Sequence, residues 1–210
     1  MSEVVLYDYW RSSAAYRVRI ALNLKGVTFR PVEVDLASGA QGSAEFRARN
    51  PLGLIPVLEI DGHQLAQSLA IIDYLEATRP LPRLLPAAPA SRARVLAKAM
   101  TIISEIHPLQ NLRVGNYLRD ELGQDADAVS RWLHRWVGDG LAALEASAPD
   151  SGLFGGDEPD LIDLCLVPQM YSARRFMVPL ERFSRLVRID EQLRAIPAFA
   201  AAAPEAVKPG

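Results

Sequence analysis

The segment IPVLEIDGHQLA, at residues 55–66, contains the strongest turn signal in the chain. Its two halves have the length and residue types of strands, and Asp61-Gly62 between them is the dipeptide that most strongly favours a two-residue hairpin turn. The stretch therefore predicts two antiparallel strands. Ser68 follows closely and is expected to cap an apolar helix over residues 69–78.

The residues before this hairpin predict an alternation of strands and helices. Residues 4–7 form a short apolar run and residues 29–34 alternate, so each stretch predicts a strand. Between them, Ser12-Ser13 precedes a pattern of helical spacing. A short helix is expected at 44–49. With the hairpin, this order indicates a small mixed α/β sheet covered by helices.

The second part of the chain predicts helices alone. Four prolines between Arg79 and Pro89 indicate a stiff linker, assigned to residues 81–90. We therefore expect an α/β domain over residues 1–80 and an all-helical domain over residues 91–210. The helices expected in the second domain cover 92–122 with a kink at Pro108, 125–148, 160–175 opening on Asp160-x-x-Asp163 as a capping box, 183–195 and 198–202.

Composition argues against several classes of function. The 23 Lys and Arg against 25 Asp and Glu give a net charge of −2, which disfavours a broad basic surface for nucleic acid. A single cysteine, Cys165, excludes a disulfide framework and a multi-cysteine zinc site, and its apolar neighbours indicate core packing. The histidines lack the spacing of metal ligands. With no signal-peptide pattern and no membrane-spanning run, we expect a cytoplasmic protein without a metal or a membrane partner.

Two polar pairs precede predicted helices. These are Ser12-Ser13 after the first strand and Gln67-Ser68 after the hairpin. A helix N-terminus presents N–H groups and a partial positive charge, so either pair could bind an anion or favour a thiolate. The simpler interpretation of each pair is an N-cap. Arg11, Arg17 and Arg19 either add positive charge near the first pair or form an ordinary solvated helix face.

The dipeptide Ile55-Pro56 stands at the start of a predicted strand. Proline cannot donate a hydrogen bond to a sheet, so it belongs at a strand end or edge. A cis peptide bond would turn the backbone of Ile55 toward a peptide-like ligand. On frequency alone the trans form is favoured, because only about 5–6% of X-Pro bonds are cis.

Five stretches of the chain form a distinctive combination. They are YWRSSAAYRVRIAL at 9–22, Asn50-Pro51 with Ile55-Pro56, QSLAIIDYL at 67–75, HPLQNL at 107–112 and DLCLVPQ at 163–169. Together they resemble the zeta-class glutathione transferases, a family that includes maleylacetoacetate and maleylpyruvate isomerases. The resemblance runs nearly end to end. It implies a thioredoxin-like N-terminal domain, an all-helical C-terminal domain, a homodimer, and glutathione as cosubstrate with a small dicarboxylic keto acid.

The resemblance also implies roles for matching residues. Ser12 would assist the glutathione thiolate and Ser13 would support it. The residues that would hold glutathione are Gln41, Ile55, Pro56, Gln67, Ser68, His107 and Asn111. Arg11, Arg113 and Arg175 would line the substrate side, and Arg175 would also be catalytic. Its neighbour Arg174 points about 100° away on the same helix, so one of the two is expected to face substrate.

The implied reaction is cis–trans isomerisation of a maleyl keto acid, maleylacetoacetate first, to its fumaryl isomer. Alternatives are maleylpyruvate as substrate, a broader transferase acting on small α-halo acids, and a non-catalytic binding protein. Retention of Ser12-Ser13 argues against the last. The family's motif cysteine is Ala14 here, and Tyr16 stands where Trp is usual. Because reductive dehalogenases of this family use that cysteine, Ala14 disfavours their chemistry and leaves isomerisation possible.

Overall fold

The computed structural model describes residues 3–209, which divide into two compact units. The first contains the chain up to Arg83 together with the segment from Ile196 onward, and the second runs from Leu84 to Ala195. This differs from the sequence prediction, which assigns the C-terminal segment to the helical domain. It groups with the first unit because Arg19 and Asn23 donate hydrogen bonds to its backbone carbonyls.

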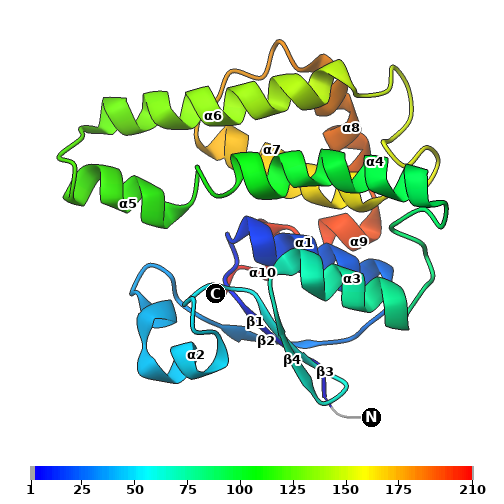
Figure 1. The fold of residues 1–210 in the computed structure, drawn as a ribbon, viewed down its shortest axis with the longest axis horizontal. Helices are drawn as coiled ribbons and strands as arrows, with labels where there is room; N and C mark the ends of the chain where they lie inside the picture. The colour runs from blue at the N-terminus through cyan, green and yellow to red at the C-terminus, as the bar shows by residue number, and fades with distance from the viewer. Residues whose placement is uncertain (1–2, 210) are drawn as a thin grey trace. The chain divides into compact units, whose positions relative to one another are not determined.

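The first unit is built on a four-stranded sheet in the order β2-β1-β3-β4 (Figure 1). The strands are β1 (Val5–Asp8), β2 (Arg30–Glu33), β3 (Val57–Ile60) and β4 (His63–Ala66). β1 pairs parallel with β2 and antiparallel with β3, and β3 pairs antiparallel with β4. Asp61 and Gly62 have φ of 54° and 80°, the positive values that a tight hairpin turn requires. The predicted hairpin is therefore confirmed.

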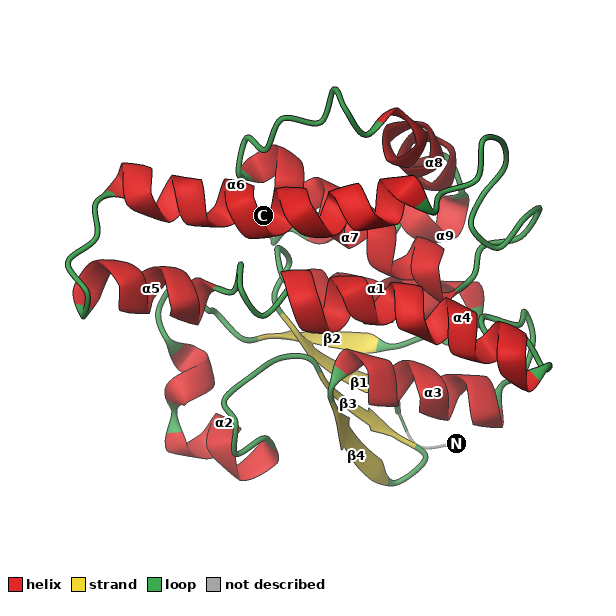
Figure 2. Ribbon diagram, turned by 45° about the horizontal axis from the view of Figure 1, so that its top comes forward, coloured by secondary structure: helices red, strands yellow, loops and turns green. Residues whose placement is uncertain are grey.

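Two helices lie side by side on one face of this sheet, α1 (Ser13–Leu24) and α3 (Ser68–Thr78) (Figure 2). Their inward residues, such as Leu22 and Ile72, are completely buried. The remaining elements of the unit are η1 (Ala40–Gly42), α2 (Ala44–Arg49), α9 (Pro197–Ala200) and α10 (Pro204–Val207). The arrangement confirms the expected thioredoxin-like α/β fold.

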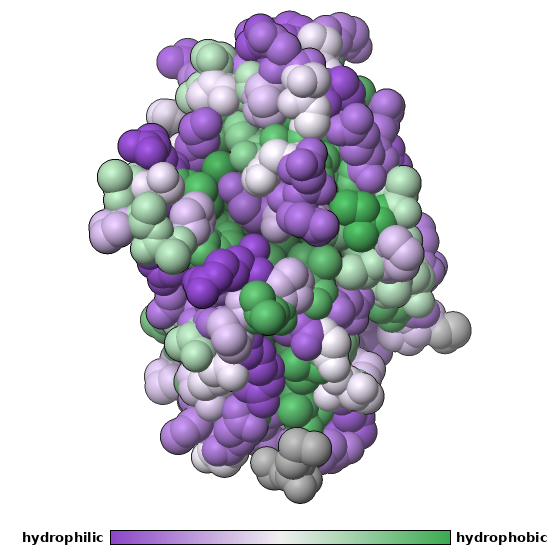
Figure 3. Space-filling model, turned by 90° about the vertical axis from the view of Figure 1, so that its right-hand side faces the viewer, coloured by the Kyte–Doolittle hydropathy of each residue, from purple (hydrophilic) through white to green (hydrophobic). Residues whose placement is uncertain are grey.

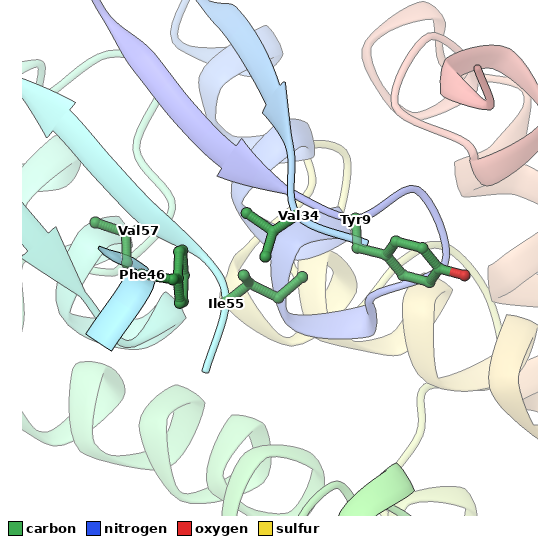
Figure 4. Close-up of a cluster of buried hydrophobic side chains, with 5 residues drawn as sticks. All are labelled: Tyr9, Val34, Phe46, Ile55 and Val57. Atoms are coloured by element: carbon green, nitrogen blue, oxygen red, sulfur yellow. The ribbon is translucent and has the colours of Figure 1, made fainter. Parts of the chain in front are cut away.

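A cluster of buried side chains lies beside the ends of the strands. It consists of Tyr9, Val34, Phe46, Ile55 and Val57 (Figure 4). These residues come from the segments after β1 and β2, from α2, and from the start of β3. Their packing fixes the loop after β1 against the segment before β3, and both segments carry predicted site residues.

The second unit is helical apart from a single bridge between Leu153 and Gly156. Its elements are α4 (Pro89–Met100), η2 (Thr101–Ile106), α5 (Leu112–Asp120), α6 (Ala126–Ala146), α7 (Leu161–Arg175) and α8 (Ser184–Arg194). α7 packs against α4, α8 and η2. Every residue from Leu161 to Met170 is buried, including Cys165 at 0% exposure, which confirms the interpretation of this cysteine as core packing.

The residues expected to form one kinked helix over 92–122 form separate helices. α4 passes directly into η2, a π-helical turn closed by a hydrogen bond from the His107 N–H to the Ile102 carbonyl at 2.9 Å. Pro108 lacks an N–H, and the chain runs through a turn before α5 begins at Leu112. The chain therefore has two separate helices, α4 with η2 and then α5, where a single kinked helix was expected.

The face drawn in Figure 3 carries hydrophilic side chains over much of its area, with hydrophobic ones between them. Such a mixture is usual for protein surfaces. Over residues 3–209, no helix has both the length and the apolar character needed to cross a bilayer.

Candidate glutathione site

Ser12 is the N-cap of α1. Its N–H donates to the Tyr9 carbonyl at 2.8 Å, and its Oγ accepts from the Ala15 N–H at 3.2 Å. The capping interpretation is therefore confirmed, and it is compatible with a second role. A serine hydroxyl that accepts one hydrogen bond still has a proton to donate, here at the positive end of a helix. Ser13 follows as the first helical residue and is buried, at 8% exposure.

The three arginines around α1 do not form a solvated face. Arg17 and Arg19 are 2% and 1% exposed. Arg17 donates from Nε and Nη2 to the Ser68 Oγ, at 3.2 and 3.1 Å. Arg11 is exposed, and its guanidinium lies 4.6 Å from the ring centroid of Trp10. The solvated-face interpretation is wrong for the two buried arginines because each has a hydrogen-bond acceptor inside the unit.

The start of α3 differs from the prediction. Ser68 is the first helical residue and does not cap the helix, since its oxygen accepts from Arg17. Gln67 occupies the N-cap position at a φ of 69°, and its exposed side chain makes no capping hydrogen bond. The N–H groups of the first turn of α3 are therefore uncapped by a side chain, a geometry that favours a carboxylate ligand.

The Ile55-Pro56 peptide bond is cis. Ile55 precedes β3, whose pairing with β1 begins at Val57, so the backbone of Ile55 lies outside the ladder. Its side chain packs in the cluster of Figure 4 and is 9% exposed. A backbone anchored beside a sheet in this way can pair with an extended peptide.

Gln41, in η1, has a buried acceptor. Its Oε1 has no hydrogen-bond partner within the described part of the chain. An unsatisfied buried acceptor costs free energy, so this position favours a ligand that brings a donor.

Two predicted residues lie in the turn that follows η2 in the second unit. His107 and Asn111 are both half-buried, and Asn111 caps α5 by accepting a hydrogen bond from the Arg113 N–H at 3.1 Å. The side chain of Arg113 itself is exposed. The structure thus places Asn111 and Arg113 in one helix start, within five residues of Pro108 and Leu109.

The adjacent arginines at the end of α7 have different surroundings. Arg174 forms an ion pair with Asp190 of α8, with Nη2 and Oδ2 2.6 Å apart. Asp190 is completely buried and also pairs with Arg194 at 3.1 Å. The exposed Arg175 has its guanidinium 4.7 Å from the ring centroid of Phe176. Arg174 therefore has a structural role, which favours Arg175 as the arginine for substrate.

Known proteins resemble this chain in sequence and in fold. A family model described as the N-terminal domain of glutathione S-transferase matches residues 2–77. A maleylacetoacetate isomerase of Rhizobium meliloti (strain 1021) is 50% identical over 211 residues, covering 99% of each chain. The holo structure of a maleyl pyruvate isomerase, a bacterial zeta-class glutathione transferase, matches with a TM-score of 0.93 and 41% identity, covering 97% of this chain and 98% of that one. The chain belongs to the zeta-class glutathione transferases.

Two solved structures of another similar protein contain ligands. A maleylacetoacetate isomerase from Anaeromyxobacter dehalogenans 2CP-1 matches this zeta-class chain with TM-scores of 0.87 and 0.86 at 42% identity, covering 98% of this chain and 97% or 96% of that one. One structure has glutathione in the active site. The other has dicarboxyethyl glutathione and citrate there.

The first unit of this zeta-class chain offers groups that fit glutathione, a tripeptide with a thiol and two carboxylates. Ser12 keeps a hydroxyl proton to donate, the backbone of Ile55 lies outside the strand ladder, and Gln41 has a buried acceptor without a partner among the described residues. The start of α3 at Gln67 suits a carboxylate.

Sequence reasoning missed the polar contacts that hold the turn carrying His107 and Asn111. Gln110 and Gln169 are both buried and exchange two hydrogen bonds through their amides, at 3.1 and 2.9 Å. Trp132 donates from Nε1 to the Leu109 carbonyl at 2.8 Å. A signal was present in the sequence: the motifs at 107–112 and 163–169 each contain one glutamine among apolar residues, and such a polar residue is expected to need a partner when buried.

The capping box at the start of α7 is confirmed. Asp160 accepts from the N–H groups of Ile162 and Asp163, and Asp163 accepts from those of Asp160, Phe154 and Gly155. Burial, and next the negative charge of Asp160, raise the pKa of Asp163 to about 7. These carboxylates organise the loop before α7, and their hydrogen bonds assign them to the structure of the unit.

Among residues 3–209 no group of three or more His, Cys, Asp and Glu side chains is placed to hold a metal ion. The remaining histidines make other contacts. His134 Nε2 lies 2.9 Å from the Phe176 carbonyl, and His63 packs edge-on against Tyr74.

Proposed function

We propose that the chain is a glutathione-dependent cis–trans isomerase that converts a maleyl keto acid, most readily maleylacetoacetate, into its fumaryl isomer. The observation that carries the proposal is the position of Ser12, which caps α1 and keeps a hydroxyl proton to donate at the positive end of that helix. Full-length identity of 50% to a maleylacetoacetate isomerase supports the choice of reaction and substrate.

Glutathione binding is assigned first to residues of the first unit. The backbone of Ile55, which lies outside the strand ladder, pairs with the peptide part of glutathione. Gln41 accepts a hydrogen bond from it, and Gln67 with Ser68 binds a carboxylate at the start of α3. We also assign His107 and Asn111 of the second unit to glutathione, on the motif that contains them.

Glutathione, when bound, supplies the sulfur nucleophile whose reversible addition to the conjugated double bond allows rotation about a single bond. Ser12 favours the ionised sulfur by donating its hydroxyl proton, and Ser13 supports the same turn of α1. Because both serines stand at a helix N-terminus, the N–H groups of the first turn lower the cost of a negative charge there.

The substrate carries two carboxylates, so its binding requires cationic groups. We assign this role to Arg11, Arg113 and Arg175, whose side chains are exposed. Arg175 is the catalytic member of the set, because charge that develops on the keto group during reaction needs a positive partner. The ion pair of Arg174 with Asp190 supports the choice of Arg175 over its neighbour.

Maleylpyruvate is the second candidate substrate, favoured by the TM-score of 0.93 to a maleyl pyruvate isomerase. Reductive dehalogenation of α-halo acids ranks lower. Ala14 replaces the cysteine that resolves mixed disulfides, and Cys165, the single cysteine of the chain, is buried in α7.

We further propose that the protein is a homodimer located in the cytoplasm. Size-exclusion chromatography with light scattering tests the dimer, and cell fractionation tests the location.

The experiment compares purified protein on maleylacetoacetate, maleylpyruvate and a small α-halo acid, each with glutathione. We expect kcat/KM to be highest for maleylacetoacetate. Ser12→Ala should lower kcat by about 10²-fold, the usual cost of losing one donor to a developing charge. The matched control is Ser43→Ala, because Ser43 caps α2 by the same type of bond, at 3.2 Å from the Phe46 N–H. Equal activity of the two variants would contradict the role of Ser12.

A further inference from the structure

Arg19 lies at the centre of a buried polar network in the first unit. It is 1% exposed, and its Nη1 donates to both carboxylate oxygens of Asp8 at 2.7 Å. Its Nη2 donates to the carbonyl of Trp10 at 3.0 Å, and its Nε donates to the carbonyl of Ala202 at 3.0 Å. One guanidinium thereby joins the end of β1, the loop after it, and the C-terminal segment.

The loop held by Arg19 is the one that presents Ser12. It is a tight turn closed by the hydrogen bond from the Ser12 N–H to the Tyr9 carbonyl. Trp10 is inside this turn, two residues before Ser12, and its carbonyl is the atom that Arg19 binds. A shift of that carbonyl would rotate the following peptide units and change where the Ser12 hydroxyl points.

The C-terminal segment contacts the same region at further points. Asn23, one helical turn after Arg19, donates to the Ala198 carbonyl at 2.9 Å. Lys208 has its Nζ 5.3 Å from the ring centroid of Trp10, a cation–π geometry. The segment therefore packs on α1 and reaches the loop both through Arg19 and directly.

We propose that Arg19 is a positioning residue for the thiolate-binding serine: by tying the Trp10 carbonyl to Asp8 and to the C-terminal segment at Ala202, it fixes the orientation of Ser12. The inference rests on the proposed function and adds to it a role for a buried arginine and for the end of the chain. Arg19 acts through the loop and does not touch the substrate.

The chemistry of the side chain explains why arginine stands here. Its planar fork donates in three directions at once, which a lysine ammonium on a flexible stem cannot do with the same geometry. The acceptors belong to three residues, Asp8, Trp10 and Ala202, in three different segments. The guanidinium is one rigid group, so it sets the relative positions of these segments. Small displacements of a catalytic group are costly to a reaction, so rigidity at this point has a functional value.

The test measures the pKa of the thiol in bound glutathione from its thiolate absorbance during a pH titration. Arg19→Lys keeps the positive charge beside Asp8 but loses the fork. A second variant, Asp8→Asn with Arg19→Gln, avoids leaving a lone buried charge that could prevent folding. Both should raise the measured thiol pKa by roughly half a unit to one unit, with less than about a threefold change in the Kd of glutathione.

The matched control is Asn23→Ala, which removes the neighbouring tie to the C-terminal segment and leaves the Trp10 carbonyl bound. It should leave the thiol pKa at the wild-type value. The proposal is overturned if both folded Arg19 variants keep the wild-type pKa, if Asn23→Ala raises it equally, or if neither Arg19 variant folds, since Arg19 would then serve stability alone.

Wild-type protein and Ser12→Ala separate this inference from the proposed function. If wild-type protein does not lower the thiol pKa of glutathione, the proposed function itself fails. If it does, and Ser12→Ala raises the pKa while the Arg19 variants do not, only the positioning role of Arg19 fails.

Discussion

Arg17 and Ser68, 51 residues apart in sequence, are joined by two buried hydrogen bonds at 3.2 and 3.1 Å. Arg17 lies in α1, which begins after the proposed thiolate serine, and Ser68 is the first residue of α3, where we place a glutathione carboxylate. The contact ties the second turn of α1 to the start of α3.

Ser68→Ala removes the oxygen that accepts both hydrogen bonds from Arg17. We expect the variant to lose about 1.5–3 kcal/mol of unfolding free energy, the usual range for a hydrogen bond to a charged group. It should also bind glutathione more weakly, because Ser68 is itself assigned to the carboxylate site and because α3 loses its tie to α1. Urea denaturation and calorimetric titration with glutathione measure the two effects. An exposed serine substitution, Ser38→Ala, is the control, and equal stability of both variants would contradict the coupling.

Substitutions of Arg175 and Arg174 are predicted to have different effects, the first on turnover and the second on folding stability. Arg175→Ala should lower turnover of the keto acid much more than it lowers glutathione affinity. Arg174→Ala should leave turnover closer to the wild-type value and reduce stability, since it leaves buried Asp190 with one fewer cation. Steady-state kinetics and thermal unfolding of both variants decide the matter. Unchanged turnover in Arg175→Ala would show that the assignment is wrong.

Asp163 should give folding stability a distinct pH dependence. Its pKa is raised from 3.8 to about 7 by burial and by Asp160, so the folded chain holds a proton that the unfolded chain releases between these values. The contribution to stability is therefore complete below pH 3.8 and is lost as pH rises through about 7. Chemical denaturation from pH 4 to 8 should show the advantage of wild type over Asp163→Asn shrinking with rising pH. An advantage that grows with pH would contradict this prediction.

Much of the fold could be predicted from local chemistry. Asp61-Gly62 predicts the hairpin turn, Ser12 predicts the start of α1, and Asp160 with Asp163 predicts the start of α7. These predictions succeed because turn and cap preferences act over a few residues. The π-helical turn of η2 could not be predicted, since its hydrogen bonds depend on how that segment packs against α6 and α7.

The site was predicted in part. The motifs indicated Ser12, Gln41 and Ile55, but their individual roles stay predictions. Sequence spacing does not determine whether the Ile55-Pro56 bond is cis or trans. It is also compatible with Arg17 and Arg19 as surface charges, although both are buried. Their partners, Ser68 and Ala202, lie 51 and 183 residues away, so only the folded chain shows why they are buried.

The decisive experiment follows maleylacetoacetate and glutathione together in the presence of purified protein. The proposed mechanism requires that fumaryl product forms over many turnovers while the glutathione concentration stays constant, and that no enzymatic product forms when glutathione is omitted. Isomerisation that proceeds without glutathione, or consumption of glutathione in proportion to the substrate converted, would contradict it.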